Sequence, residues 1–436
     1  MHWKNNVVCI VLSLLWIVPL HAQDVLSFDD ALKFTLEQNY SIKMARLDEQ
    51  AAKNNASRAN SGYVPNVNGT GAYNWTLYKG TTEAISGDTD FDAASSYNYN
   101  AGVSLNYTLF DGQGRKFDYL QLKETHALSQ LQVRQLIENT ILELSTIYYD
   151  VLKLQEADSS LQQALEISKE RLQRAEYAYE YGQANQLDIL NAKVDLNVDS
   201  INLVNNLQVL GNARRTLNLV MGTEIETLYN LADELVINQN IQENDVVSAT
   251  LANNVEIAAL NSDLKIAELS IGSAKSNWLP GLGVNAGYSY RGTDDPNGAF
   301  VTGSSSYGPN AGLSLNWSLF DFRNKTRVQN AKIDLESKRI EEESVKQTVR
   351  LNALNAYAVY TNALFVMQAQ QENVNTAQNN FERSQEAFKL ASITSVEFRQ
   401  AQVNLLNTKL QYSEAKYNAK NAELNVLALM GALMNN

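Results

Sequence analysis

The chain has 436 residues, with 48 Asp and Glu against 35 Lys and Arg, which gives a formal charge of −13. Such a charge would repel a phosphate backbone, and no Lys/Arg cluster offsets it, so we expect no nucleic-acid partner. A single cysteine excludes zinc-ribbon, iron–sulfur and disulfide-scaffold proteins. Only 5 prolines are present where average usage would give about 20, which favours long uninterrupted helices.

The first 22 residues have the pattern of a secretory signal peptide. Lys4 precedes an apolar run at residues 7–20, and Ala22 offers a small residue at the cleavage point. The run is about 14 residues long, shorter than the roughly 20 that span a bilayer, so we expect cleavage rather than anchoring. Cys9 lies inside the run, which disfavours a lipid anchor at the amino terminus. Because the removed segment contains one charge, that of Lys4, the mature chain has a formal charge of −14.

Three short motifs occur twice in the same order along the chain. They are an aromatic-apolar-Pro triplet, a Leu-Asn-aromatic run that continues to Leu-Phe-Asp, and a Met-Gly pair. The second copies lie 209 to 215 residues after the first: Pro65 and Pro280, Leu105 and Leu315, Met221 and Met430. This order and spacing predict an internal duplication. We predict one repeat at 23–222, a linker at 223–243 and a second repeat at 244–436.

Each repeat contains two segments that alternate between apolar and polar residues. The alternation predicts strands at about 66–78, 97–110, 281–291 and 307–320. Their length of about 10–13 residues and their aromatic content suit membrane-spanning strands, and their uncharged Asn, Ser, Thr and Gly suit a wet lumen. A soluble sandwich with its apolar face inward is the alternative, although four strands are few beside such long helices.

Four strands cannot close a barrel, because open edges in lipid would leave unpaired backbone groups that cost several kcal/mol each. Chains must therefore pool their strands, and two chains would supply 8 whereas three would supply 12. An 8-stranded barrel is filled by side chains, so a channel favours three. After residue 23 no window approaches 18 uninterrupted apolar residues, and we expect no transmembrane helix.

The segments that join the strands, 79–96 and 292–306, are polar and are expected to form exposed loops. Asp88, Asp90 and Asp92 alternate as in a calcium loop. The glycine at the turn and the closing Glu are both missing, so we predict no metal site.

The helices are expected to be far longer than those of a globular domain. Residues 116–181 contain neither proline nor glycine, which predicts a rod of about 100 Å, and 324–390 repeat this pattern. Apolar residues at three-and-four spacing predict a coiled-coil seam, and shorter helices return at 186–221 and 396–430. Because the hydrocarbon core is about 30 Å thick, such rods must project from the bilayer, and a lumen continued through them would be a conduit.

Together these residues resemble the TolC family of outer-membrane efflux and secretion channels. The resemblance rests on the first segment at 26–32, the aromatic-apolar-Pro strand openers, the Leu-Phe-Asp-Gly turn at 109–112 and the Met-Gly ends. It implies a mainly α fold with a small β part. Each chain would have long coiled-coil α-helical hairpins and four transmembrane strands, and the trimer would combine a 12-stranded β-barrel with a helical barrel.

The resemblance also implies partners and location. It implies a homotrimer in outer-membrane lipid with a long periplasmic extension, a periplasmic adaptor (a membrane fusion protein), and an inner-membrane pump of RND, ABC or MFS type. No cofactor is implied.

The family's functional elements lie where the long helices turn back, with an aromatic-x-x-Gly element followed by an acidic residue at the periplasmic constriction. The corresponding docking residues here are Tyr179, Tyr181 and Gly182 in the first repeat, and Phe388 and Ala391 in the second. The constriction residues are Asp188 and Glu397. Ala391 stands where the family has glycine, so the second turn need not share the family's geometry. Ile393 lies near the family's basic gating residue, so no salt-bridge latch is predicted there.

Three copies of Asp188 and Glu397 around an axis would form acidic rings that favour cations, with pKa values that are coupled and partly raised. The alternative is that these carboxylates lie solvated on an exposed helix face.

We therefore expect a passive outer-membrane duct of a tripartite efflux or type I secretion system, with energy supplied by the pump. The alternative is a trimeric outer-membrane coiled-coil surface protein or adhesin, which would need one continuous stalk rather than duplicated hairpins. An enzyme is disfavoured, because the only mature histidine, His126, has no acid–nucleophile set nearby in the sequence.

Overall fold

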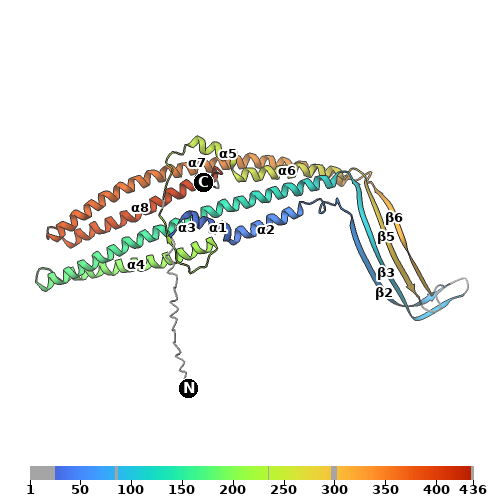
Figure 1. The fold of residues 1–436 in the computed structure, drawn as a ribbon, viewed down its shortest axis with the longest axis horizontal. Helices are drawn as coiled ribbons and strands as arrows, with labels where there is room; N and C mark the ends of the chain where they lie inside the picture. Colours follow the sequence, from blue (N-terminus) through green and yellow to red (C-terminus); the bar gives the residue numbers. More distant parts are fainter. Residues whose placement is uncertain (1–24, 84–86, 234, 296–301, 434–436) are drawn as a thin grey trace, which may run out of the picture. The chain divides into compact units, whose positions relative to one another are not determined.

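A computed structural model describes residues 25–83, 87–233, 235–295 and 302–433. The predicted signal peptide therefore lies outside the described residues. The helices are α1 Phe28–Gln38, α2 Tyr40–Asn55, α3 Gly114–Glu180, α4 Gln186–Met221, α5 Glu243–Asn253, α6 Val255–Ser276, α7 Phe322–Lys389 and α8 Ser395–Leu429. The strands are β1 Val25–Leu26, β2 Asn66–Thr82, β3 Thr89–Asp111, β4 Asn230–Leu231, β5 Gly281–Asp294 and β6 Gly303–Asn316. The predicted fold class, mainly α with a small β part, is confirmed (Figure 1).

The chain divides into two compact units. Among the described residues, unit 1 lies within 25–39, 143–237 and 365–421, and unit 2 lies within 40–142, 238–364 and 422–433. Helices α3 and α7 are 67 and 68 residues long, and both contribute residues to each unit. Among the described helices, none is long and apolar enough to cross a membrane.

Unit 2 contains an antiparallel sheet with the strand order β2-β3-β5-β6, whose strands lie side by side in Figure 1. Its register brings the apolar sets of all four strands onto one face: Trp75 is opposite Tyr97, Val103 is opposite Tyr288, and Val284 is opposite Leu313. The alternation seen in the sequence therefore gives one apolar and one polar face across the whole sheet.

The strand ends differ from the sequence-based expectation. Past a bulge at Tyr78/Gly80, strand β2 continues to Thr82, and strand β3 already begins at Thr89. Much of the segment expected as a loop therefore belongs to the two strands. Strand β6 ends at Asn316, and the Trp317 side chain beyond it donates a hydrogen bond from Nε1 to the carbonyl of Trp278 at 3.1 Å. The predicted strand at 307–320 was therefore wrong at its carboxyl end, because Trp317 is held by a side-chain contact instead of a ladder partner.

A tight turn connects the sheet to the helices within unit 2. Gly112 has φ +67, and a Cβ there would lie 2.4 Å from the carbonyl oxygen of Ser276, so only glycine fits. Arg115 then fixes the start of α3: its Nε pairs with Asp111 at 3.1 Å, and its guanidinium lies 5.0 Å from the ring centre of Tyr63.

In unit 1, an aromatic cluster holds the short β1–β4 pair against α3. The hydroxyl of Tyr148, a fully buried residue, lies 2.8 Å from the carbonyl oxygen of Leu26 and 2.9 Å from that of Ala232. The ring of Phe28 contacts Tyr148 at 5.5 Å and Tyr149 at 5.8 Å between centroids. The segment that joins the two repeats is thus attached to the long helix by buried polar and aromatic contacts.

Candidate functional site: the hairpin ends of unit 1

The first hairpin end is the turn between α3 and α4. Gly182 is left-handed with φ +71, its N–H donates to the carbonyl of Tyr179 at 3.0 Å, and the N–H of Gln183 donates to the carbonyl of Ala178 at 2.7 Å. This is the Schellman arrangement that satisfies the last carbonyls of a helix. The side chain of Tyr181 is 77% exposed at this turn and that of Tyr179 is 49% exposed, so both are available to a partner.

The second hairpin end, between α7 and α8, has the same turn. Ala391 takes the left-handed conformation with φ +55, its N–H donates to the carbonyl of Phe388 at 3.1 Å, and the N–H of Ser392 donates to the carbonyl of Ala387 at 2.8 Å. The alanine therefore adopts the conformation of the glycine at the first end, at the steric cost of a Cβ in that region. The departure from the family's residue changes the strain of the turn and leaves its hydrogen-bond pattern unchanged.

Asp188 and Glu397 both cap the helix that follows each turn. Asp188 accepts from the N–H of Asn185 at 3.2 Å and donates its own N–H to the Asn185 side chain at 3.1 Å. Glu397 accepts from the N–H of Thr394 at 2.7 Å and from its hydroxyl at 2.9 Å. Each pair is a capping box, so both carboxylates have a local structural role at the start of a helix.

The contacts at Thr394 also affect the charge of Glu397 within one chain. The hydrogen bonds from the backbone and then the hydroxyl of Thr394 lower the pKa of Glu397 below its ordinary value. In the single chain the carboxylate is therefore stabilised in its charged form.

Phe388 lies in a different environment from the exposed tyrosines. Its ring stacks on Phe398 at 4.8 Å, next to the buried Phe381 and Leu405, and the guanidinium of Arg174 lies 4.4 Å from its centre. The residue thus fixes the end of α7 against α8 from inside. On the outside of the second end, Leu390 is 77% exposed.

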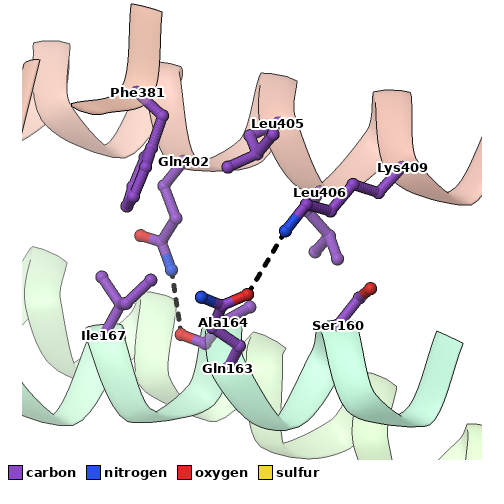
Figure 2. Close-up of a pocket in the computed structure, with 9 residues that line it drawn as sticks. All are labelled: Ser160, Gln163, Ala164, Ile167, Phe381, Gln402, Leu405, Leu406 and Lys409. Atoms are coloured by element: carbon purple, nitrogen blue, oxygen red, sulfur yellow. Dashed lines mark hydrogen bonds between the residues drawn. The ribbon is translucent and has the colours of Figure 1, made fainter. Parts of the chain in front are cut away.

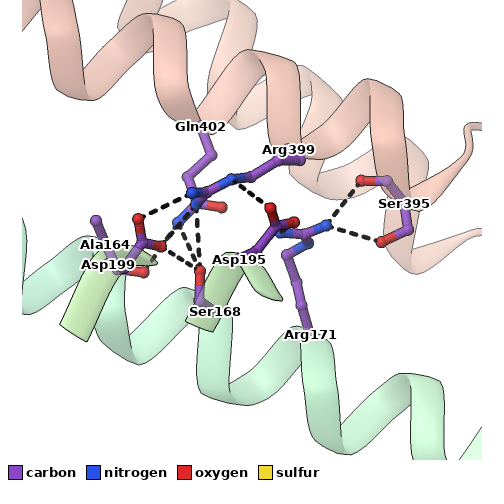
Figure 3. A network of polar contacts seen from close by, with 8 residues as sticks. All are labelled: Ala164, Ser168, Arg171, Asp195, Asp199, Ser395, Arg399 and Gln402. Carbon is purple, nitrogen blue, oxygen red and sulfur yellow. Dashed lines mark hydrogen bonds and ion pairs between the residues drawn. The ribbon is translucent and has the colours of Figure 1, made fainter. Parts of the chain in front are cut away.

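Behind both ends lies a buried polar cluster that the sequence analysis missed (Figure 3). The carboxylate of Asp199 on α4 accepts from Arg399 of α8 at 2.6 and 2.8 Å and from the Ser168 hydroxyl of α3 at 2.5 Å. Arg171 of α3 donates to Asp195 of α4 at 2.9 Å. Asp199 is only 2% exposed.

The same cluster reaches the start of α8, where Arg171 donates to the hydroxyl of Ser395 at 3.0 Å and to its carbonyl at 3.2 Å. Burial works against the charge on Arg399, but the hydrogen bonds and charge of Asp199 outweigh it, so the pKa of Arg399 is raised. The cluster therefore joins three helices, α3, α4 and α8, through charged groups that depend on one another.

The gap beside this cluster is too small for cargo. Figure 2 shows Gln402 pointing across it to donate to the carbonyl of Ala164 at 2.9 Å, while Lys409 reaches Gln163 at 3.4 Å. The cavity holds about 20 Å³, room for a single water. It is a packing gap among α3, α8 and Phe381 of α7.

A second polar cluster in unit 1 attaches the linker. Lys416 of α8 pairs with Glu156 of α3 at 2.7 Å and with Asp233 of the linker at 2.6 Å. Burial alone would raise the pKa of Glu156, but hydrogen bonds from Lys416, Ser413 and Tyr417 outweigh it and lower the pKa. Across the part of the chain that the structure describes, no group of His, Cys, Asp and Glu is arranged to hold a metal ion.

The sequence and the fold of this chain are both similar to those of known outer-membrane proteins. The chain matches the family described as outer membrane efflux protein over residues 31–223 and 246–432. It is 24% identical to the outer membrane protein TolC of Escherichia coli K12, covering 91% of this chain and 80% of TolC. It is 20% identical to the cation efflux system protein CusC of Escherichia coli O157:H7, and the match covers 91% of this chain and 84% of CusC. The crystal structure of the CmeC outer membrane channel of Campylobacter jejuni superposes with a TM-score of 0.72 at 16% identity, covering 93% of this chain and 86% of CmeC.

Proposed function

The chain belongs to the outer membrane efflux protein family and is an outer-membrane channel of a tripartite efflux system; from this premise we propose that three copies form one passive duct. In this proposal the sheet of each copy contributes four strands to a 12-stranded barrel in the outer membrane. The helical part extends into the periplasm and receives cargo from a periplasmic adaptor and an inner-membrane pump, which supplies the energy.

The observation that carries the proposal is the two-faced sheet with two unsatisfied edges. Strands β2 and β6 are the outer strands in the order β2-β3-β5-β6, so within the described residues each pairs on one side only. Unpaired backbone groups are not tolerated in lipid, and pairing β2 of one copy with β6 of the next satisfies both edges. The apolar face then meets lipid, and the polar face, which carries Asn, Ser, Thr and Gly together with the single charge of Arg291, lines water.

We assign two roles to the hairpin ends. At the first end, the exposed docking surface for the adaptor consists of Tyr179, Tyr181 and Gly182. At the second end, Ala391 forms the left-handed turn, and Phe388 packs beneath that turn against α8. Three copies of these ends meet around the axis of the duct, where the adaptor binds.

Asp188 and Glu397 would form acidic rings at the same level of the duct. Each carboxylate uses one oxygen in its cap, so the second oxygen can still act on a passing ion. Asp188→Asn with Glu397→Gln keeps hydrogen-bond acceptors for the caps and removes the charge. A lower cation preference in planar bilayers supports the rings, and an unchanged one leaves the carboxylates as caps only.

The proposed function is tested by efflux from living cells. A strain that lacks this chain should accumulate a fluorescent efflux dye, and the wild-type chain should restore efflux. Tyr181→Ala should restore it poorly if the first end docks the adaptor, with surface amounts checked by immunoblot. Chemical crosslinking of outer membranes should give trimers; crosslinks that stop at the monomer would contradict the assembly.

A further inference from the structure

We propose that Arg291 sets the charge preference of the outer part of the lumen, where three copies form a ring of guanidinium groups that attracts anions. The inference rests on the proposed trimeric duct. It assigns a specificity-determining residue within the sheet of unit 2.

The register places Arg291 on the polar face of the sheet. It is opposite Asn100 of β3 and Ser306 of β6, which belong to the polar sets of their strands. Its neighbour Tyr290 is opposite Ala101 and Tyr307, which belong to the apolar face. Since successive side chains point to opposite faces, the guanidinium emerges where the duct carries water.

Arg291 is also the only charged residue in the body of the sheet. The segments 66–78, 94–110, 281–293 and 303–316 contain no other Lys, Arg, Asp or Glu. The residues around it on the polar face are uncharged: Asn98, Asn100, Gly102, Ser289, Thr293, Ser304, Ser306 and Gly308. Arg291 is therefore the one charge within these four segments, and its neighbours on the polar face are neutral.

Arg291 is exposed and makes no hydrogen bond or ion pair with the residues that the structure describes. Two carboxylates lie further along the strands: Asp295 accepts from the Ser96 hydroxyl at 2.5 Å and keeps its negative charge, and Asp92 pairs with Lys79 at 2.6 Å. Asp294 is opposite Tyr97, so it lies on the apolar face.

Guanidinium is suited to this role because it stays charged at all working pH values and presents several donors to carboxylate or phosphate groups. Three such charges about 10 Å from the axis should change the ratio of cation to anion permeability about two- to fivefold at 0.1 M salt. The effect should disappear at 1 M salt, where the screening length is about 3 Å.

The test is the reversal potential of purified trimers in planar bilayers under a KCl gradient. Arg291→Gln should shift the preference toward K⁺ by about two- to fivefold at 0.1 M, and Arg291→Lys should keep the wild-type value. Lys265→Gln is the control for loss of one positive charge, because Lys265 lies on α6 and pairs with Glu124 at 2.9 Å.

Two results would overturn the assignment. One is an Arg291→Gln channel that conducts with the wild-type ion preference, and the other is an equal shift from Lys265→Gln, since net charge rather than position would then explain it. Either result leaves the duct itself intact. If wild-type trimers carry no current, the proposed function fails instead.

Discussion

The buried pair between Asp199 and Arg399 should be the most sensitive polar contact in unit 1. Asp199→Asn preserves the size of the side chain and removes its charge, so one of the two short contacts to Arg399, at 2.6 and 2.8 Å, is replaced by two opposed N–H donors and the other loses its ionic character. The remaining carboxylate within reach, that of Asp195, lies 3.6 Å from Nε. Breaking a buried pair in this way costs about 3–5 kcal/mol, because a charge is left uncompensated.

The assay is hydrogen exchange of the full-length protein in detergent, read at amides of α4 around residue 199. A loss of about 3 kcal/mol corresponds to exchange more than a hundredfold faster, if exchange follows local opening. Glu166→Gln is the control, because Glu166 pairs with Lys169 at 3.2 Å with both side chains more than half exposed, and should change exchange less than about threefold.

A double variant separates charge from packing. Asp199→Asn with Arg399→Gln removes both charges, so it should exchange more slowly than Asp199→Asn alone. The reasoning is refuted if Asp199→Asn accelerates exchange no more than Glu166→Gln does.

Three further predictions concern the turns, the helices and the linker. Gly182→Ala should lower the free energy of unfolding by about 1 kcal/mol and Ala391→Gly should raise it by a similar amount, because both residues have left-handed backbone conformations. Thermal unfolding should therefore show melting temperatures that shift in opposite directions. Gly272→Ala should lower the melting temperature, since its Cβ would lie 2.3 Å from the Phe117 ring, whereas Gly211→Ala, with only a flexible arginine end at 3.9 Å, should raise it. Because the pKa of Glu156 is lower in the folded state, its carboxylate stabilises the fold above about pH 4.5, and this contribution is lost as the pH falls through the folded pKa. Proteolysis of the linker should therefore increase at pH 4. Glu156→Gln should weaken this pH dependence.

The long elements could be predicted from the sequence because their signals are local. The absence of proline and glycine predicts α3 and α7 within two residues at each end. Alternation likewise predicts the faces of β3 and β5, since a period of two needs no knowledge of the partner strand. Alternation alone could not locate the end of β6, because Trp317 continues the pattern although its indole bonds outside the ladder.

The candidate site was predictable in part. The sequence indicated the position of both hairpin ends, but it could not show that Ala391 keeps the left-handed turn, because that depends on the helices on either side. Asp195 and Asp199 are four residues apart and share a face of α4, a signal that was readable. Their pairing with Arg171 and Arg399 depends on the register between three helices, which no local pattern specifies.

The most direct test of the duct is the conductance of the purified wild-type protein in a planar bilayer, with its mass measured in the same detergent. The account predicts a particle of three chains that gives long-lived current steps, which grow with salt concentration and need no energy source. A particle of three chains that inserts into the bilayer and carries no current would contradict it.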